Sequence, residues 1–432
     1  MLKLQPVPGT HDLLPEAALR HRHVVETAYA VARSYGYQPI DTPIIEFTEV
    51  FRRTLGDTSD IVTKEMYAFT DKGGDNLTLR PEGTAGVVRA LIGADLKQEL
   101  PVKLFYAGPM FRRERPQKGR QRQFHQIGVE LLGVEMGLGD AEVIALGADV
   151  LRALGVADKA VLHINTLGDS ESRRAYRDKL VDFLRPYGDQ LSADSQLRLE
   201  TNPLRTLDSK DAGDRRIIAD APRIEDSLTG SARETFARVL GWLDDAGVAY
   251  QIDQRLVRGL DYYCDTAFEF VTDALGAQGT ILAGGRYDGL AETMGGRQMP
   301  GIGWAAGVER LAMLVADPPS PPRPIWVVPI APRAEGAADD RPSAEERAAW
   351  RLVQELRRSG LAAEIGFGGS LRFRLNKASK EYPRSGKRNA RAAVLLGEDE
   401  RARGVATVRD MDTGQQSEVP LDALARHLAA FR

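Results

Sequence analysis

Two apolar runs that flank a basic loop constrain the fold of this chain more than any other feature. The first is PVKLFYAGPMF at 101–111, and the second extends from Phe124 to Leu132. Each run has the length and composition of a buried strand, so together they predict an antiparallel hairpin. The loop carries six cations, which are Arg112, Arg113, Arg115, Lys118, Arg120 and Arg122. Cations at this density predict an anionic ligand such as a polyphosphate, and the alternative is a solvated, charged hairpin tip.

The amino-acid sequence of this hairpin resembles that of a known protein family. Residues 111–130 read FRRERPQKGRQRQFHQIGVE, which resembles motif 2 of the class II aminoacyl-tRNA synthetases and closely that of the histidyl-tRNA synthetases. The resemblance implies an ATP site in which Arg112 meets the α-phosphate, with Mg²⁺ as the expected cofactor beside the phosphates. The ring of Phe124 offers a face on which the base can stack. The ATP-binding residues expected in this segment are Arg112, Glu114, Arg120 and Phe124.

Two other segments resemble the remaining motifs of that class. Residues 301–314, GIGWAAGVERLAML, read as a glycine-rich strand that runs into a helix with Arg310 near its start. An arginine there opposes the helix dipole and favours an anionic partner, although a tolerated surface arginine is the alternative. The segment resembles motif 3, which implies that Arg310 binds the ATP phosphates. A helix from Pro15 to Gly36, followed by the strand-like run 37–51, resembles motif 1, which builds the dimer interface and implies a homodimer.

Three short segments carry the resemblance to the histidyl-tRNA synthetases in particular. They are NLTLRPEGT at 76–84, RGLDYY at 258–263 and AGGRYDGL at 283–290. The resemblance implies that Glu82 holds the α-amino group of histidine, and that Glu130 and Tyr263 contact its imidazole ring. The expected histidine site comprises Glu82, Thr84, Arg112, Gln126, Glu130, Arg258, Tyr262, Tyr263 and Tyr287.

The catalytic residues implied by the resemblance are Arg112 and Arg258. Arg258 is expected at the α-phosphate and the substrate carboxylate, where related synthetases use a metal ion. From the residues alone, Arg258 is only an arginine beside a glycine, on a strand expected from Leu256 to Phe270. The tyrosines read equally well as core aromatics with a satisfied hydroxyl. No side chain is an obvious general base for the transfer to tRNA.

Changes in pattern divide the chain into three parts. Polar helical segments dominate 168–247, and the run NPLRTLDSK within them resembles the insertion of bacterial histidyl-tRNA synthetases, which approaches the acceptor end of tRNA. The proline-rich DPPSPPRP at 317–324 is the clearest boundary, and strands and helices alternate beyond it. These patterns predict an α+β catalytic domain with an antiparallel sheet at 1–167 and 248–318, a helical insertion at 168–247, and a mixed α/β anticodon-binding domain at 323–432.

The middle of the third part is basic. Its cations are Arg372, Arg374, Lys377, Lys380, Arg384, Lys387, Arg388 and Arg391. A positive patch attracts a phosphate backbone, whereas a charged, solvated face is the alternative. Residues 373–391 also depart from the family pattern, because Pro383 should stop the helix that other members continue.

Composition limits the partners and cofactors. With 432 residues, of which 43% are hydrophobic, the chain can form more than one core, and its net charge of -3 leaves nucleic-acid contacts to local patches. The single cysteine, Cys264, excludes an internal disulfide and a CxxC zinc pair. His21 and His23 point to different sides of a predicted helix, so no metal site made by side chains is expected. Without a signal peptide or a membrane-length apolar run, the sequence predicts a soluble, cytoplasmic protein.

The resemblance as a whole implies an enzyme that ligates L-histidine to tRNA(His) with ATP through a histidyl-adenylate. The strongest alternative is the histidine-sensing regulatory subunit of ATP phosphoribosyltransferase, which has the same catalytic fold but typically lacks the anticodon domain. A synthetase for another amino acid and a tRNA-binding protein without catalysis are further alternatives. Because the sequence keeps Arg112, Arg258 and Arg310 and has the extra domain, we favour the enzyme.

Overall fold

The computed structural model divides into two compact units, Met1–Pro319 and Ser320–Arg432. Each unit is described by itself. The residues that the structure describes are 4–56, 59–94, 100–116, 119–257, 260, 262–276, 279–316, 320–330, 342–366, 375–379 and 389–431. Among the described helices, none combines the length and the apolar character needed to cross a bilayer.

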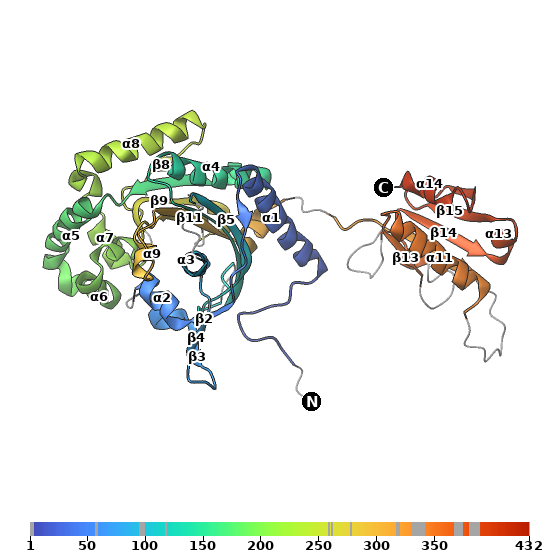
Figure 1. The fold of residues 1–432 in the computed structure, drawn as a ribbon, viewed down its shortest axis with the longest axis horizontal. Helices are drawn as coiled ribbons and strands as arrows, with labels where there is room; N and C mark the ends of the chain where they lie inside the picture. Colours follow the sequence, from blue (N-terminus) through green and yellow to red (C-terminus); the bar gives the residue numbers. More distant parts are fainter. Residues whose placement is uncertain are drawn as a thin grey trace. The chain divides into compact units, whose positions relative to one another are not determined.

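An eight-stranded sheet forms the centre of the first unit (Figure 1). In spatial order its strands are β1 (Gln38–Pro39), β5 (Val102–Phe111), β6 (Gln123–Leu132), β11 (Gly301–Gly307), β10 (Thr280–Arg286), β9 (Cys264–Val271), β7 (Val161–Thr166) and β8 (Gln251–Ile252). The inner six strands pair antiparallel, and only the short outer strands β1 and β8 pair parallel. The hairpin predicted from the two apolar runs is confirmed as β5 and β6, which pair from Val102↔Leu132 to Phe111↔Gln123.

Helices cover the two faces of this sheet in different ways. The outer side carries α1 (Pro15–Ser34), α4 (Leu138–Ala153), α8 (Gly230–Asp245) and α10 (Val308–Leu314), whereas α3 (Thr84–Gly93) lies within the concave side (Figure 1). Successive side chains of β6 alternate between the two faces of the sheet. Ile127 and Val129 belong to the core beneath the outer helices, and Leu132 belongs to the cluster around α3. Because strand side chains alternate, Glu130 lies on the α3 side with Leu132.

A small sheet follows α1, and it corrects one expectation. Its strands are β2 (Ile45–Phe47), β4 (Asn76–Leu79) and β3 (Tyr67–Thr70), and helix α2 (Thr48–Leu55) begins directly after β2. The prediction that 37–51 is strand-like throughout is therefore wrong from Thr48 onward. Phe51 and Leu55 are both fully buried four residues apart, which is a helical rather than a strand period. The strand predicted from Leu256 is likewise shorter than expected, because β9 starts at Cys264.

The helical segment contains α5 (Ser170–Leu184), α6 (Ala193–Thr201) and α7 (Ala212–Ile218), followed by α8. Its own core includes Tyr176, Leu180 and Ile218, whereas Phe236, Val239 and Leu243 of α8 pack into the core of the large sheet. Burial raises the pKa of Asp214, but hydrogen bonds from Ser192, Ser195 and Ser209 outweigh burial and hold the pKa at about 2. This carboxylate joins α6, α7 and the NPLRTLDSK run into one unit.

The second unit is a mixed sheet with helices, as predicted. Its strands are β13 (Ala363–Ile365), β12 (Ile325–Ile330), β14 (Ala392–Gly397), β15 (Val405–Asp410) and β16 (Gln416–Pro420). The first three pair parallel and the last two antiparallel. The helices are α11 (Ala344–Arg358), α13 (Glu398–Ala402) and α14 (Leu424–Ala429). Most of the basic run, including Pro383, lies outside the described residues.

Candidate active site

A cavity of about 230 Å³ opens on the concave side of the large sheet, next to α3. Residues of β6, β10 and β11, of the loop between β5 and β6, and of the segment before β9 contribute to its wall. Of the predicted site residues, the following line it: Glu82, Thr84, Arg112, Glu114, Arg120, Phe124, Gln126, Tyr262, Tyr263 and Arg310. Residues that are far apart in the sequence therefore meet in one cavity.

Glu82 is fixed by the start of α3. Its carboxylate accepts hydrogen bonds from the backbone nitrogens of Thr84 at 2.6 Å and Ala85 at 2.9 Å. Burial raises the pKa of Glu82, and these two hydrogen bonds and the charge of Arg112 oppose that rise. The chain turns at Pro81 after β4, which brings the carboxylate to the cavity wall. Glu82 is thus a rigid, buried acceptor that suits an ammonium group.

Glu130 and Tyr287 do not line the cavity and reach it through Thr84. The hydroxyl of Thr84 donates to Glu130 Oε1 at 2.6 Å, and the hydroxyl of Tyr287 donates to Glu130 Oε2. Burial raises the pKa of Glu130 to about 8, although both hydrogen bonds favour the ionised form. At neutral pH this carboxyl is therefore protonated in a large fraction of molecules.

The raised pKa of Glu130 predicts a pH-dependent stability. The pKa is about 8 in the folded chain against an ordinary value of 4.5, so the folded state holds the proton more tightly. The stabilisation is complete below the unfolded pKa and is lost as the pH rises through 8, at about 1.4 kcal/mol per pH unit. Replacing Glu130 by Gln removes this loss. We expect urea unfolding at pH 6 and pH 9 to differ less in Glu130→Gln than in the unchanged chain, and an equal difference contradicts the assignment.

Gly303 provides the space that Glu130 occupies. A Cβ on Gly303 would overlap Glu130 Oε2 and the carbonyl oxygen of Val129. We expect Gly303→Ala to destabilise the first unit by about 1–3 kcal/mol, as overpacking does. Gly289→Ala is the matched control, because a Cβ added at Gly289 would meet no atom within 4 Å. Thermal unfolding measures the effect, and identical stability of the two variants contradicts the role of Gly303.

Arginines form a further part of the cavity wall. Arg112 Nε donates to the carbonyl oxygen of Pro81 at 2.9 Å, and its guanidinium lies 5.4 Å from the ring centre of Phe124. Arg120 forms an ion pair with Glu114. Burial, followed by the charge of Arg120, lowers the pKa of Arg310, and Arg112 adds to this effect. Such crowding of cations is relieved when an anion binds between them.

Arg310 is held in place by the backbone. Its Nε donates to the carbonyl oxygen of Gly119 at 3.2 Å, and its Nη1 donates to that of Thr280 at 2.6 Å. These bonds join the loop after β5, the start of β10 and helix α10. The arginine wall is therefore preorganised, which is what stabilisation of a charged transition state requires.

Polar and aromatic residues also line or adjoin the cavity. The side-chain Oε1 of Gln126 is buried and has no hydrogen-bond partner among the described residues. The rings of Tyr262 and Tyr263 lie 4.6 Å apart, and Tyr262 is 5.9 Å from Tyr287 in an edge-on arrangement. Arg258 lies outside the residues that the structure describes. Its expected position is therefore not part of this geometry.

Four supporting residues were not anticipated from the sequence, namely Arg286, Asp140, Asp288 and Tyr106. Arg286 is fully buried and pairs with Asp140 at 2.6 Å and with Asp288 at 2.8 Å, directly beside Tyr287. The AGGRYDGL motif could have indicated Arg286 and Asp288, which lie within it, whereas no motif in the sequence indicates Asp140. The ring of Tyr106 lies where a Cβ on Gly128 would be, so the glycine of β6 is needed for packing beneath the cavity.

Comparison with known proteins agrees with this geometry. Residues 9–311 match the family model described as histidyl-tRNA synthetase, and residues 325–430 match an anticodon binding domain. A histidine–tRNA ligase of Rhodospirillum rubrum is 57% identical over 432 residues, which is 100% of both chains. One of Gluconacetobacter diazotrophicus is 56% identical over 431 residues, again with 100% of both chains covered. The crystal structure of apo histidyl-tRNA synthetase from S. aureus aligns with a TM-score of 0.79 and 33% identity over 99% of each chain.

The antiparallel sheet with its arginine-lined cavity, together with the separate mixed α/β unit, defines a class II aminoacyl-tRNA synthetase. The family model covers well over half of the chain, and the relatives match it from end to end. The chain belongs to the histidyl-tRNA synthetase family.

Proposed function

We propose that the cavity binds L-histidine and ATP side by side, forms histidyl-adenylate, and passes the histidyl group to tRNA(His). The overall activity is the ligation of histidine to its tRNA, as in the 57% identical relative. The observation that carries the assignment of the site is the meeting of a fixed carboxylate, Glu82, with the arginines Arg112 and Arg310 in one cavity. A zwitterionic amino acid and a polyphosphate together need both kinds of group.

The histidine half of the reaction rests on the carboxylates. We assign the α-ammonium group to Glu82, whose two hydrogen bonds from the start of α3 hold it still. The imidazole is assigned to the region of Glu130 and Tyr263, where Thr84 and Tyr287 orient the Glu130 carboxyl. A buried polar site of this kind discriminates strongly, because a side chain without ring nitrogens leaves its groups unpaired. Gln126 completes this half with its unpaired oxygen.

The ATP half rests on the arginines. In the activation step a carboxylate oxygen of histidine attacks the α-phosphorus of ATP, and pyrophosphate leaves. Two anions meet in that step, so positive charge between them lowers the barrier. We assign Arg112 to the α-phosphate, Arg310 and Arg120 to the outer phosphates, and the ring of Phe124 to the base. Arg258 is assigned by resemblance to the space between the substrate carboxylate and the α-phosphate.

Magnesium is proposed as the cofactor that neutralises the phosphates, since the class uses it with ATP. Glu114, which lines the cavity with Arg112 and Arg120, would offer an oxygen ligand of the type that Mg²⁺ prefers. Its carboxylate forms an ion pair with Arg120 in this structure.

A second cleft supports the binding of the tRNA acceptor end. The cleft adjoins the first cavity, because both are lined by Arg112, Glu114, Arg120 and Leu260. Its far wall belongs to the helical segment and includes Arg198, Arg205 and Lys210. Arg198 and Arg205 both pair with Asp60 across the cleft, which holds the helical segment against the sheet.

Lys210 provides a test of this tRNA path. We expect Lys210→Ala to raise the KM for tRNA about tenfold, because one phosphate contact typically contributes about 1–2 kcal/mol at low salt. Pyrophosphate exchange without tRNA should stay unchanged. Arg174→Ala, at an exposed position on α5 away from the cleft, is the matched control. An unchanged KM in Lys210→Ala argues against this path.

We also propose that the chain is a homodimer. Around β2 the side chains of Ile44, Ile45 and Phe47 are 41%, 49% and 57% exposed, which is unusual for large apolar residues grouped on one small sheet. A second copy would cover them, in the place that motif 1 implies. Sedimentation of the unchanged chain and of Phe47→Glu tests this: a dimer that Phe47→Glu dissociates supports the proposal, and a monomer in both cases refutes it.

The experiment that tests the function is histidine-dependent exchange of pyrophosphate into ATP, without tRNA and with each other amino acid as a control. We expect exchange with histidine alone. If histidine binds without exchange, the chain acts as a histidine sensor of the regulatory-subunit type instead. The second unit argues against that alternative, because it matches an anticodon binding domain.

A further inference from the structure

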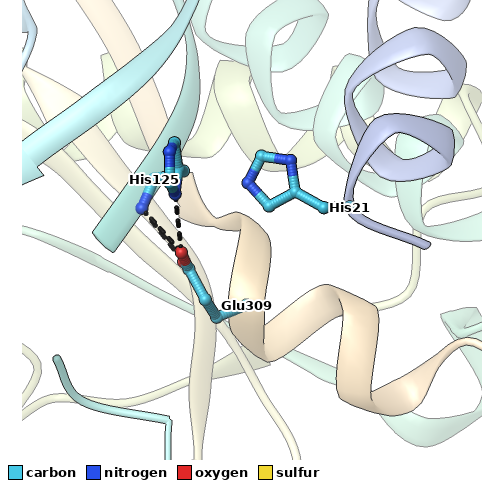
Figure 2. Close-up of side chains that lie close together, drawn as sticks. All are labelled: His21, His125 and Glu309. Carbon is cyan, nitrogen blue, oxygen red and sulfur yellow. Dashed lines mark hydrogen bonds and ion pairs between the residues drawn. The ribbon is translucent and has the colours of Figure 1, made fainter. Parts of the chain in front are cut away.

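We propose that His21, His125 and Glu309 form a binding site for a divalent transition metal, and that Zn²⁺ is the ion it suits best. The three side chains come from different elements: His21 from α1, His125 from β6 and Glu309 from α10 (Figure 2). Their ligand atoms all lie within 4.8 Å of one another. Two imidazoles and one carboxylate are a ligand set that zinc takes in proteins.

His21 is the residue whose position most needs an explanation. Its Nε2 is buried and has no hydrogen-bond partner among the described residues. Figure 2 shows a ring nitrogen of His21 turned toward His125, and the two ring centres are 4.4 Å apart at an angle of 81°. A buried ring nitrogen without a partner is costly, so its lone pair suits a ligand.

His125 and Glu309 already form the other half of the site. His125 Nδ1 lies 2.8 Å from Glu309 Oε1, and the backbone nitrogen of His125 donates to both carboxylate oxygens at 3.0 Å. The backbone bond can hold one oxygen of the Glu309 carboxylate while the other turns to an ion, which is how outer hydrogen bonds orient metal ligands.

Binding requires a small adjustment of the side chains. Zinc bonds of about 2.0–2.2 Å place the ligand atoms of a tetrahedral site about 3.3 Å apart. The atoms here lie within 4.8 Å, so His21 must move closer by rotation of its side chain, and the His125–Glu309 pair must open slightly. Zinc at Nδ1 of His125 requires the imidazole tautomer that carries its proton on Nε2, so the contact between Nδ1 and Glu309 is given up as zinc binds. Three protein ligands leave the fourth position for water.

A second group of residues with metal-ligand atoms is a weaker candidate for a metal site. Cys264, Asp265 and Asp288 also lie within 4.8 Å of one another. Asp288 Oδ1 accepts hydrogen bonds from Arg286 at 2.8 Å and from the backbone nitrogen of Gly301 at 3.0 Å. That carboxylate is already committed, and burial raises the pKa of the Cys264 thiol, which disfavours the thiolate that a metal needs.

The position of the site gives it a consequence for the cavity. His125 lies between Phe124 and Gln126, which both line the cavity, and Glu309 and Arg310 line it as well. A zinc ion would therefore connect α1 to the strand and the helix that carry these residues.

Competition with a chromophoric chelator tests the proposal on the full chain after its metals are removed. We expect one equivalent of Zn²⁺ to bind with a Kd below about 10 μM, and saturating Zn²⁺ to raise the Tm as binding to the folded state must. His21→Asn should weaken this binding at least about tenfold and lose the rise in Tm. His23→Asn is the matched control, since His23 lies two residues further along α1 with its Nδ1 near the Thr27 hydroxyl.

Zinc binding by the variants and X-ray absorption each have an outcome that overturns the proposed metal site. Pyrophosphate exchange by His21→Asn first shows that the variant is folded, because His21 does not line the cavity. The proposal is overturned if the unchanged chain binds no equivalent of Zn²⁺ below about 10 μM, or if His21→Asn binds it as tightly as His23→Asn does. X-ray absorption at the zinc edge is the second measurement. It should show nitrogen and oxygen ligands with imidazole scattering, and a purely aqueous shell also overturns the proposal.

Discussion

Histidine-dependent pyrophosphate exchange is expected to fall about 10²–10³-fold when Arg112 is replaced by lysine, as it does when one donor to a developing charge is lost. Lysine keeps the positive charge but has no planar fork. Arg112 uses Nε to bond the carbonyl oxygen of Pro81, which leaves the rest of its guanidinium for the cavity and places it against the Phe124 ring. A lysine cannot be held by the backbone and reach a phosphate in the same way.

The control for this prediction is the next residue. Arg113 is exposed and does not line the cavity, so Arg113→Lys should keep exchange within about threefold. The Tm of both variants should remain close to that of the unchanged chain. If Arg112→Lys also stays within threefold, the assignment of Arg112 to the α-phosphate is wrong.

The second large effect is expected at Glu82. We expect Glu82→Gln to raise the KM for histidine about 10²–10³-fold, because removing one partner of a buried charge pair costs about 3–5 kcal/mol. The amide keeps the size of the side chain but loses the charge that we assign to the α-ammonium group. It can also accept only one of the two hydrogen bonds from Thr84 and Ala85. The KM for ATP should change far less.

Two measurements separate binding from folding in this variant. Circular dichroism and thermal unfolding report whether α3 still forms after its carboxylate is lost. Glu292→Gln, an exposed glutamate in the first turn of α9 (Leu290–Thr293), controls for the removal of one negative charge. A stable Glu82→Gln variant with an unchanged KM for histidine would remove Glu82 from the site.

Much of the fold could be read from the chain because local pattern and tertiary structure agree. The two long apolar runs became β5 and β6, and the glycine-rich strand running into a helix became β11 and α10. The proline-rich run lies at the division between the two compact units. The errors fell where a short segment had no clear period, at 48–51 and before Cys264. There the burial of Phe51 and Leu55 against neighbouring helices decided the outcome.

The candidate site, too, could be predicted from the sequence only in part. The side chains expected from the family motifs include ten that line one cavity, and the motif letters were sufficient to name them. The motifs could not indicate that Glu130 and Tyr287 lie behind the cavity wall, where Glu130 bonds to Thr84 and Tyr287 packs against Tyr262. That relation depends on which residues share a face of β6 and on the space left by Gly303.

The sequence by itself determined the family, the order of the strands and helices, and the residue types that the chemistry requires, because these are properties of local runs of residues. Only the tertiary structure decided which distant side chains share a proton or a charge. Thr84 meets Glu130 46 residues away, Tyr287 meets it across 157 residues, and His125 meets Glu309 across 184. Periodicity specifies the face of an element on which a side chain lies, but its partner depends on strand register and helix packing, which form only when the whole sheet is assembled.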